Sequence, residues 1–149
     1  DAQESRGLGD VYKRQMIGID ELLDMLDWNN DPTIQAKGIE LARDVKTTNP
    51  FVLPMDSKYG KNVWENCAKI INERSDEQIR PYLRRLFVWI GDLTLPGALI
   101  IWERLLKFND TEYMLFILDS CKACANATND FGIHTLLEFE SELIDKKQE

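Results

Sequence analysis

Residues 81–108 read PYLRRLFVWIGDLTLPGALIIWERLLKF, and they carry two of the four tryptophans together with many long aliphatic side chains. Apolar residues recur at helical spacing on both sides of a break at residues 91–96. This pattern predicts two amphipathic helices joined by a short turn. Because a short turn sets neighbouring helices antiparallel, we expect a compact helix pair around which the rest of the chain packs.

The same spacing predicts which side chains this pair buries. The expected inner residues are Leu83, Leu86, Phe87 and Ile90 in the first helix, and Leu99, Trp102, Leu105 and Leu106 in the second. We expect Asp92 or Thr94 to cap the second helix and Pro96 to occupy its first turn, where an N–H group has no intrahelical partner. Charges interrupt the stretch, and a membrane span needs ~20 apolar residues, so we expect a core and no membrane contact.

Length and charge narrow the choice of partner. The chain has 149 residues, a length that fits one domain over residues 16–149. It has 26 acidic and 18 basic side chains and a net charge of -8. This charge opposes binding to nucleic acid and to anionic membranes. We therefore expect a basic protein partner, and three cysteines without a hydrophobic signal segment predict a reducing, cytoplasmic location.

Residues 1–15 lack any hydrophobic period, and residues 10–15 read DVYKRQ. This hexapeptide is typical of a translated sequencing adaptor. We therefore expect residues 1–15 to be either an assembly artefact or a disordered polar tail, and to contribute to neither the core nor the function.

The remaining periodic segments predict an all-α chain of about seven helices. A helix from Ile19 to about Trp28 precedes one that Asp31 caps, and a third covers residues 63–71. The motif from Ser75 to Gln78 is a capping box, which opens the helix leading into the core stretch. Residues 113–127 predict a sixth helix that is apolar all round, so we expect it to be buried on several sides and to contact the fifth and seventh helices.

Two further groups of apolar residues are expected inside the fold. The first lies along the second and last helices, and the second lies in the irregular connection over residues 47–60. In the second helix these residues are Ile34, Gly38, Leu41, Ala42 and Val45. In the last helix they are Ile133, Leu136, Leu137, Leu143 and Ile144, and in the connection they are Phe51, Val52, Leu53 and Met55.

Residues 22–32 and 86–96 share one pattern, in which an apolar helix end precedes an aspartate in the turn and a proline that opens the next helix. This recurrence resembles the turn of HEAT repeats. Residues of about 53–145 also resemble a family of small bacterial HEAT-like domains of unknown function, through LPMDSK at 53–58 and WIGD at 89–92 before PGA at 96–98. Leu95 stands where the family usually has tryptophan.

The resemblance implies an α-α superhelix, a stack of antiparallel helix pairs, without an established activity. Some small domains of this general kind are immunity proteins that neutralise toxins. Fold-level analogy of this sort makes toxin neutralisation a candidate function and nothing more.

Cys121 and Cys124 have the CxxC spacing that zinc and thiol redox sites use. A structural zinc site needs four ligands, and the remaining candidates, Cys67 and His134, lack partnered spacing. Two residues one helical turn apart share a face, where cysteine packs as a small core residue. We therefore expect core packing, with a thiol or zinc protein as the alternative.

No residue pattern predicts catalysis or a cofactor. His134 is the only histidine, no glycine-rich phosphate loop occurs, and many carboxylates lie four residues before a lysine or arginine on the same helix. Arg80, Arg84 and Arg85 form a basic cluster, which we interpret as a solvated face paired with Asp76 and Glu77, with docking of an acidic partner or a phosphate as the alternative. The sequence thus favours a non-enzymatic binding protein.

Four residues are the candidates for partner binding. Trp28 lies in a predicted turn and is the candidate anchor for an interface. Glu138, Glu142 and Asp145 lie on the outer side of the last predicted helix. These carboxylates would occlude a basic cleft of a partner such as a toxin, and salt would weaken the electrostatic steering.

Overall fold

A computed structural model describes residues 17–52, 59–128 and 132–148, and within these ranges the chain forms helices and no strand. The core stretch forms two helices, as predicted. The α-helices are α2 (Ile19–Met25), α3 (Pro32–Ala42), α4 (Trp64–Asn72), α5 (Asp76–Ile79), α6 (Leu83–Ile90), α7 (Ala98–Leu106), α8 (Thr111–Ala127) and α9 (Gly132–Gln148), with 3₁₀ turns η1 (Asn49–Phe51), η2 (Lys61–Val63) and η3 (Arg80–Tyr82).

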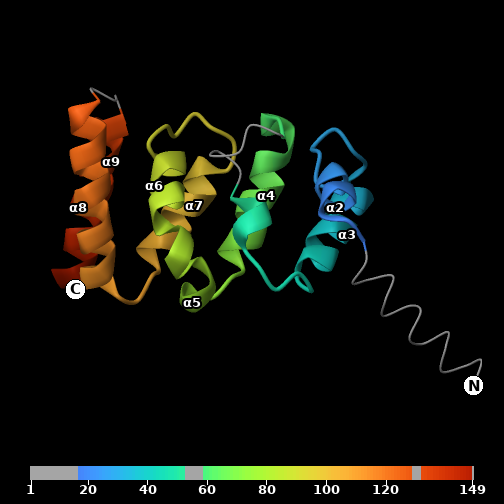
Figure 1. Cartoon of the computed structure of the whole chain (residues 1–149), viewed down its shortest axis with the longest axis horizontal. Coiled ribbons are helices and arrows are strands. Elements are labelled where there is room, and N and C mark those ends of the chain that lie inside the picture. Colours follow the sequence, from blue (N-terminus) through green and yellow to red (C-terminus); the bar gives the residue numbers. More distant parts are fainter. Residues whose placement is uncertain (1–16, 53–58, 129–131, 149) are drawn as a thin grey trace, which may run out of the picture.

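The long helices lie side by side in a row in which successive helix pairs follow the order of the chain, except that α7 lies between α4 and α6 (Figure 1). The pair α2 and α3 forms one end, and the pair α8 and α9 forms the other. Between them, α3 packs on α4, α4 packs on α7, and α6 packs on both α8 and α9. The pair α6 and α7 therefore joins the two halves of the row, which confirms the central place predicted for residues 81–108.

The inner face of α6 is as predicted, and that of α7 is shifted. Leu83, Leu86, Phe87 and Ile90 are all buried. In α7, Trp102 and Leu105 are buried, Leu106 is half-buried, and Leu99 is 61% exposed. The prediction for Leu99 is wrong because the face that packs on the other helices runs through Ala98, Ile101, Trp102 and Leu105, which leaves Leu99 one residue off the stripe.

The turn before α7 also differs from the prediction. The Asp92 carboxylate accepts hydrogen bonds from the main-chain N–H and hydroxyl of Thr94 within the turn, at 2.9 and 2.6 Å, so it does not cap α7. The residue before the helix is Gly97, with φ of 81°. Pro96 precedes the helix, and its carbonyl accepts a 2.9 Å hydrogen bond from the indole of the fully buried Trp89.

The segment that the capping box opens is divided. Ser75 accepts from the main-chain N–H of Gln78, and the Gln78 side chain accepts from the N–H of Ser75, as predicted. The helix then ends at Ile79 and a 3₁₀ turn follows, because Pro81 has no N–H to continue the ladder and its ring clashes with the preceding turn. The predicted fourth helix is therefore α5, η3 and α6.

The expectation for the sixth helix is wrong in part: its contact with the last helix is confirmed, but its all-round burial and its contact with the fifth helix are not. α8 buries Met114, Ile117, Leu118 and Ala125, but Phe116 is 68% exposed. The helix packs against α6 and α9, whereas the expected neighbours were α7 and α9. Because α8 belongs to the last pair in the row, only one side of it is covered.

In α9 and α3, too, some of the side chains predicted to face the core are exposed. In α9, Leu136 and Leu143 are buried together with Phe139, whereas Leu137 and Ile144 are exposed and Ile133 is half-buried. In α3, Gly38 and Ala42 are buried, Leu41 and Val45 are half-buried, and Ile34 is exposed. A Cβ on Gly38 would lie 2.9 Å from Leu26 Cδ2 and 3.0 Å from the Cβ of Met25, so the absence of a side chain at Gly38 lets α3 pack against the end of α2.

The connection after α3 packs on the helices, as predicted for its first part. Phe51 and Val52 are fully buried. The Arg85 guanidinium donates to the carbonyl of Val52, and that of Arg74 lies 5.6 Å from the Phe51 ring centroid. Leu53 and Met55, like residues 1–16, lie outside the described residues.

Buried polar side chains tie neighbouring layers together. Arg104 of α7 donates twice to the carbonyl of Arg74, at 2.9 and 3.2 Å, and once to Asp76 at 2.7 Å. Arg74 in turn donates to the carbonyl of Ala42 at 2.9 Å, and Asn66 donates to that of Leu26 at 2.7 Å. These bonds stabilise the row because all but the bond to Asp76 satisfy a buried main-chain carbonyl group on another segment.

Within the described ranges, every helix is too short or too polar to cross a membrane.

Candidate functional site

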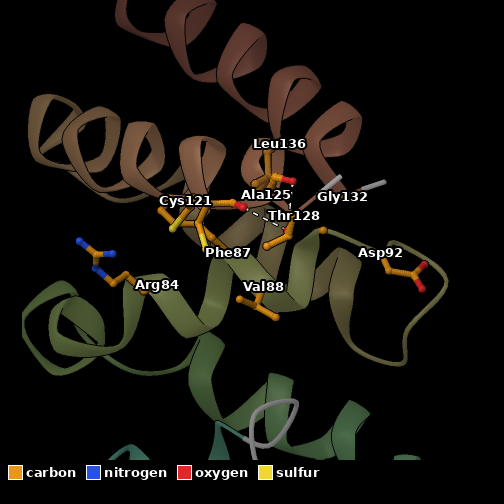
Figure 2. A pocket seen from close by; sticks show the side chains of 11 residues that line it. Arg84, Phe87, Val88, Asp92, Cys121, Ala125, Thr128, Gly132 and Leu136 are labelled. Carbon is orange, nitrogen blue, oxygen red and sulfur yellow. Dashed lines mark hydrogen bonds between the residues drawn. The ribbon is translucent and has the colours of Figure 1, made fainter. Parts of the chain in front are cut away.

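A cavity of about 350 Å³ opens between α6, α8 and the start of α9. Its lining residues come from three helices and the turn after α6 (Figure 2). They are Arg84, Phe87, Val88, Gly91, Asp92, Cys121, Cys124, Ala125, Thr128, Gly132 and Leu136. Clefts of this size with mainly apolar walls are typical of small-molecule sites.

The apolar part of the cavity is built partly from core residues. Phe87 and Leu136 are buried in the core, and the Phe87 ring meets that of Phe139 edge to face with centroids 5.7 Å apart. Val88 lies one turn after Arg84 on α6 and is 52% exposed. The hydroxyl of Thr128 donates to the carbonyl of Cys124 at 3.1 Å, so it is held against the end of α8.

Two charged groups lie at opposite ends of the lining. Arg84 lies in the first turn of α6 and Asp92 follows the helix, about 12 Å further along at 1.5 Å per residue. Figure 2 shows the two side chains on opposite sides of the apolar group. Hydrogen bonds from the Thr94 side chain and main chain lower the pKa of Asp92, so the carboxyl group is ionised at neutral pH.

Cys121 and Cys124 share one face of α8, as predicted, and both line the cavity. The expected core role is wrong for Cys124, which is exposed, and holds in part for the half-buried Cys121. Burial raises the pKa of Cys121, and nearby Arg84 opposes this effect only partly. A redox-active thiol needs a lowered pKa, so this environment does not favour a reactive thiolate.

The zinc candidates are not brought together. Cys67 is buried in α4, where burial raises its pKa, and His134 is exposed on α9. Neither lines the cavity that holds the other two cysteines. Among the described residues, no three histidine, cysteine or carboxylate side chains form a group that could hold a metal ion.

The predicted acidic residues all lie on the outside of α9. Glu138, Glu142 and Asp145 are exposed, and they follow helical spacing along one side. Trp102 of α7 donates its indole N–H to a Glu142 carboxylate oxygen at 3.1 Å, which fixes that side chain. We call the three carboxylates the α9 acidic face.

Trp28 is separated from the α9 acidic face by the length of the row. Its side chain is 45% exposed, as predicted for a turn residue, and its main-chain N–H donates to the carbonyl of Asn62 at 3.0 Å. The pair α2 and α3 that flanks this turn lies at the opposite end from α9 (Figure 1). The four predicted partner-binding residues therefore form two separate sites.

The basic cluster predicted on the fourth helix is also dispersed. Arg80 pairs with Asp110 at 3.6 Å and stacks on Tyr113, with 3.8 Å to the ring centroid. Arg85 donates to Asn49 and Val52. Neither pairs with Asp76 or Glu77 as expected, and Arg84 alone of the three lines the cavity.

Sequence reasoning missed the cavity because no motif marks it. One signal was available: Arg84 and Val88 lie four residues apart on the exposed side of an otherwise regular helix, so an apolar side chain stands where a polar one is expected. The arrangement can hold an apolar group beside a cation. No family model, curated protein or solved structure matches the chain.

Proposed function

We propose that the protein is a non-enzymatic binding module, built as a HEAT-like stack of antiparallel helix pairs, that binds a basic protein through the α9 acidic face. The observation that carries the proposal is the exposure of three carboxylates on the last helix of the row. The net charge of -8 adds a long-range attraction for a basic partner.

Two ion pairs support antiparallel packing within the last helix pair. Glu112, near the start of α8, pairs with Lys147 near the end of α9 at 3.1 Å. Lys122, in the second half of α8, pairs with Glu140 in the middle of α9. Residue numbers that rise along one helix and fall along the other are expected when the two helices run in opposite directions.

The composition of the outer side of α9 suits a protein interface. Leu137 and Ile144, which are 45% and 39% exposed, lie on the same helix as the carboxylates. Exposed apolar groups and charges on one helix combine an area that can be desolvated with a means of steering. The hydrogen bond from Trp102 holds Glu142 in place before binding, which reduces the entropy cost of association.

An immunity-type role is the form of this function that we favour. A toxin that acts on a polyanion needs a basic cleft, and the α9 acidic face would fill such a cleft with carboxylates. The mechanism is occlusion, since it needs complementary charge and shape but no chemistry by this chain. Trp28, at the other end of the row, would take part only if the partner spans the whole row.

The test is a comparison of two charge variants with a partner recovered by affinity capture and then purified. The first variant neutralises the face through Glu138→Gln, Glu142→Gln and Asp145→Asn. We expect a loss of about tenfold or more in affinity at low salt, mainly through slower association, and a smaller loss at high salt. Surface plasmon resonance at several salt concentrations measures both rate constants.

The control removes the same net charge elsewhere, through Glu40→Gln, Glu65→Gln and Glu103→Gln, which are exposed on α3, α4 and α7. We expect less than about a twofold change in affinity for this variant. Equal losses for the two variants, an affinity independent of salt, or the recovery of no basic partner would contradict the proposal. Inhibition of the purified partner's own activity by the wild-type chain would support the immunity form.

A further inference from the structure

The cavity between α6, α8 and α9 is distinct from the α9 acidic face, and binding to a basic protein leaves it without a role. Its volume of about 350 Å³ corresponds to about a dozen groups of water size at roughly 30 Å³ each. Because the cavity opens to solvent and has mainly apolar walls, an apolar occupant would displace water from it and gain contacts with those walls. Both its size and its walls fit a small amphipathic molecule.

The polar end of the cavity has a cation that the protein leaves available. Arg84 is exposed and makes no ion pair with the described residues, whereas its neighbours Arg80 and Arg85 are bound to Asp110, Asn49 and Val52. A planar guanidinium binds a carboxylate through two parallel hydrogen bonds. Arg84 is therefore a ready partner for an anionic head group.

Asp92, at the opposite end of the cavity, repels an anionic head group and so sets the orientation of the occupant. Asp92 is ionised there, and its carboxylate already accepts from Thr94. A carboxylate placed near Asp92 would be repelled, whereas one near Arg84 is attracted. Between the two ends, Phe87, Val88 and Leu136 provide only apolar contact.

We propose that this cavity binds a medium-chain alkyl carboxylate, with its head group on Arg84 and its chain along Phe87, Val88 and Leu136. The chain length follows from the volume, since about a dozen non-hydrogen atoms fill it. The cysteines on the α8 wall lie against the bound chain, and their thiols become inaccessible when the cavity is filled.

The probe is decanoate, used below its micelle concentration, with decanol as a neutral probe of equal length. We expect titration calorimetry to show one decanoate bound per chain, and at least about fivefold weaker binding of decanol. Decanoate is also expected to slow alkylation of Cys124 and Cys121 by a soluble maleimide at least about fivefold. Mass spectrometry of the labelled peptides measures each thiol separately, with the buried Cys67 as the internal reference.

Two pairs of variants test the two parts of the cavity. Arg84→Gln removes the head-group partner, and we expect about a fivefold loss of decanoate affinity, whereas Arg80→Gln removes the same charge outside the cavity and is expected to have no effect. Val88→Glu places an anion in the apolar wall, with an expected loss of at least about tenfold. Leu99→Glu is its control, because Leu99 is exposed on α7 away from the cavity. Both positions tolerate a polar side chain, and circular dichroism verifies that each variant is folded.

Binding and thiol protection that depend on Arg84 and Val88 but not on Arg80 and Leu99 would support the proposal. The absence of decanoate binding would overturn it. Equal affinity for decanol and decanoate would also overturn it, because the carboxylate would then have no role. So would unchanged labelling of Cys124 at saturating decanoate, since the ligand would then lie elsewhere.

Discussion

Replacing Gly97 with alanine is expected to lower the free energy of unfolding by about 3 kcal/mol. Gly97 has φ of 81°, a left-handed conformation that costs a residue with a Cβ about 1–2 kcal/mol. The added Cβ would also lie 2.6 Å from the Cβ of Ala68 and 3.0 Å from the carbonyl oxygen of Trp64. The overlap forces α4 and α7 apart, and overpacking of this kind typically costs a further 1–3 kcal/mol or so. Urea unfolding followed by circular dichroism measures the loss.

Gly18→Ala is the matched control. Gly18 precedes α2 with φ of -65°, and a Cβ there would meet nothing within 4 Å. The smaller conformational freedom of alanine in the unfolded chain offsets the slightly poorer helix cap. We expect a change within about 0.5 kcal/mol, and similar losses for the two variants would show that the approach of α4 to α7 is not the cause.

Replacing Arg104 with methionine is expected to lower the free energy of unfolding by about 3 kcal/mol. The substitution keeps most of the apolar stem but removes the donors to the Arg74 carbonyl and to Asp76. Arg104 is only 7% exposed, and a buried acceptor left without its partner bears the full cost of desolvation. Differential scanning calorimetry or urea unfolding gives the change.

The comparison variant is Arg43→Met. Arg43 also makes two hydrogen bonds to a carboxylate, that of Glu73, but the two side chains are 60% and 41% exposed. Solvent screens this pair, so we expect a much smaller loss than for Arg104→Met. Equal losses of unfolding free energy for Arg104→Met and Arg43→Met would show that the burial of Arg104 does not cause the larger effect.

The Arg104 effect is expected to depend on pH. Partial burial alone would raise the pKa of Asp76, but hydrogen bonds from the Asn109 N–H and Arg104 lower it below its ordinary value of 3.8. A carboxyl group with a lower pKa in the folded state stabilises the fold above the ordinary value, and this stabilisation is lost as the pH falls through the folded value. The difference in free energy of unfolding between the wild type and Arg104→Met should therefore become smaller as the pH falls below the ordinary pKa of Asp76.

Sequence periodicity predicted the helices well, but it predicted a whole buried face only for α6. Leu83, Leu86, Phe87 and Ile90 are buried because α6 has neighbours on several sides. Phe116, Leu137 and Ile144 are equally apolar, yet they are exposed because α8 and α9 form the last pair. Periodicity identifies apolar positions, but the number of neighbouring helices decides which of them are covered.

The cavity could not be predicted for a related reason. Arg84, Cys124 and Leu136 lie on three helices, and their meeting depends on how α6, α8 and α9 pack. The spacing of Cys121 and Cys124 correctly placed them on one face of a helix, but it could not reveal that this face borders solvent. The α9 acidic face was predictable because it depends on a single helix.

The arrangement of the helices in a row has a consequence for local opening. In such an array each pair gains most of its stability from its neighbours, so free energies of opening are lowest at the two ends. Amide protons of α2 and α9 should therefore exchange with deuterium sooner than those of α6 and α7. A ligand or partner held by the last pair would slow exchange there first, so binding would rigidify one of the two ends that open most easily.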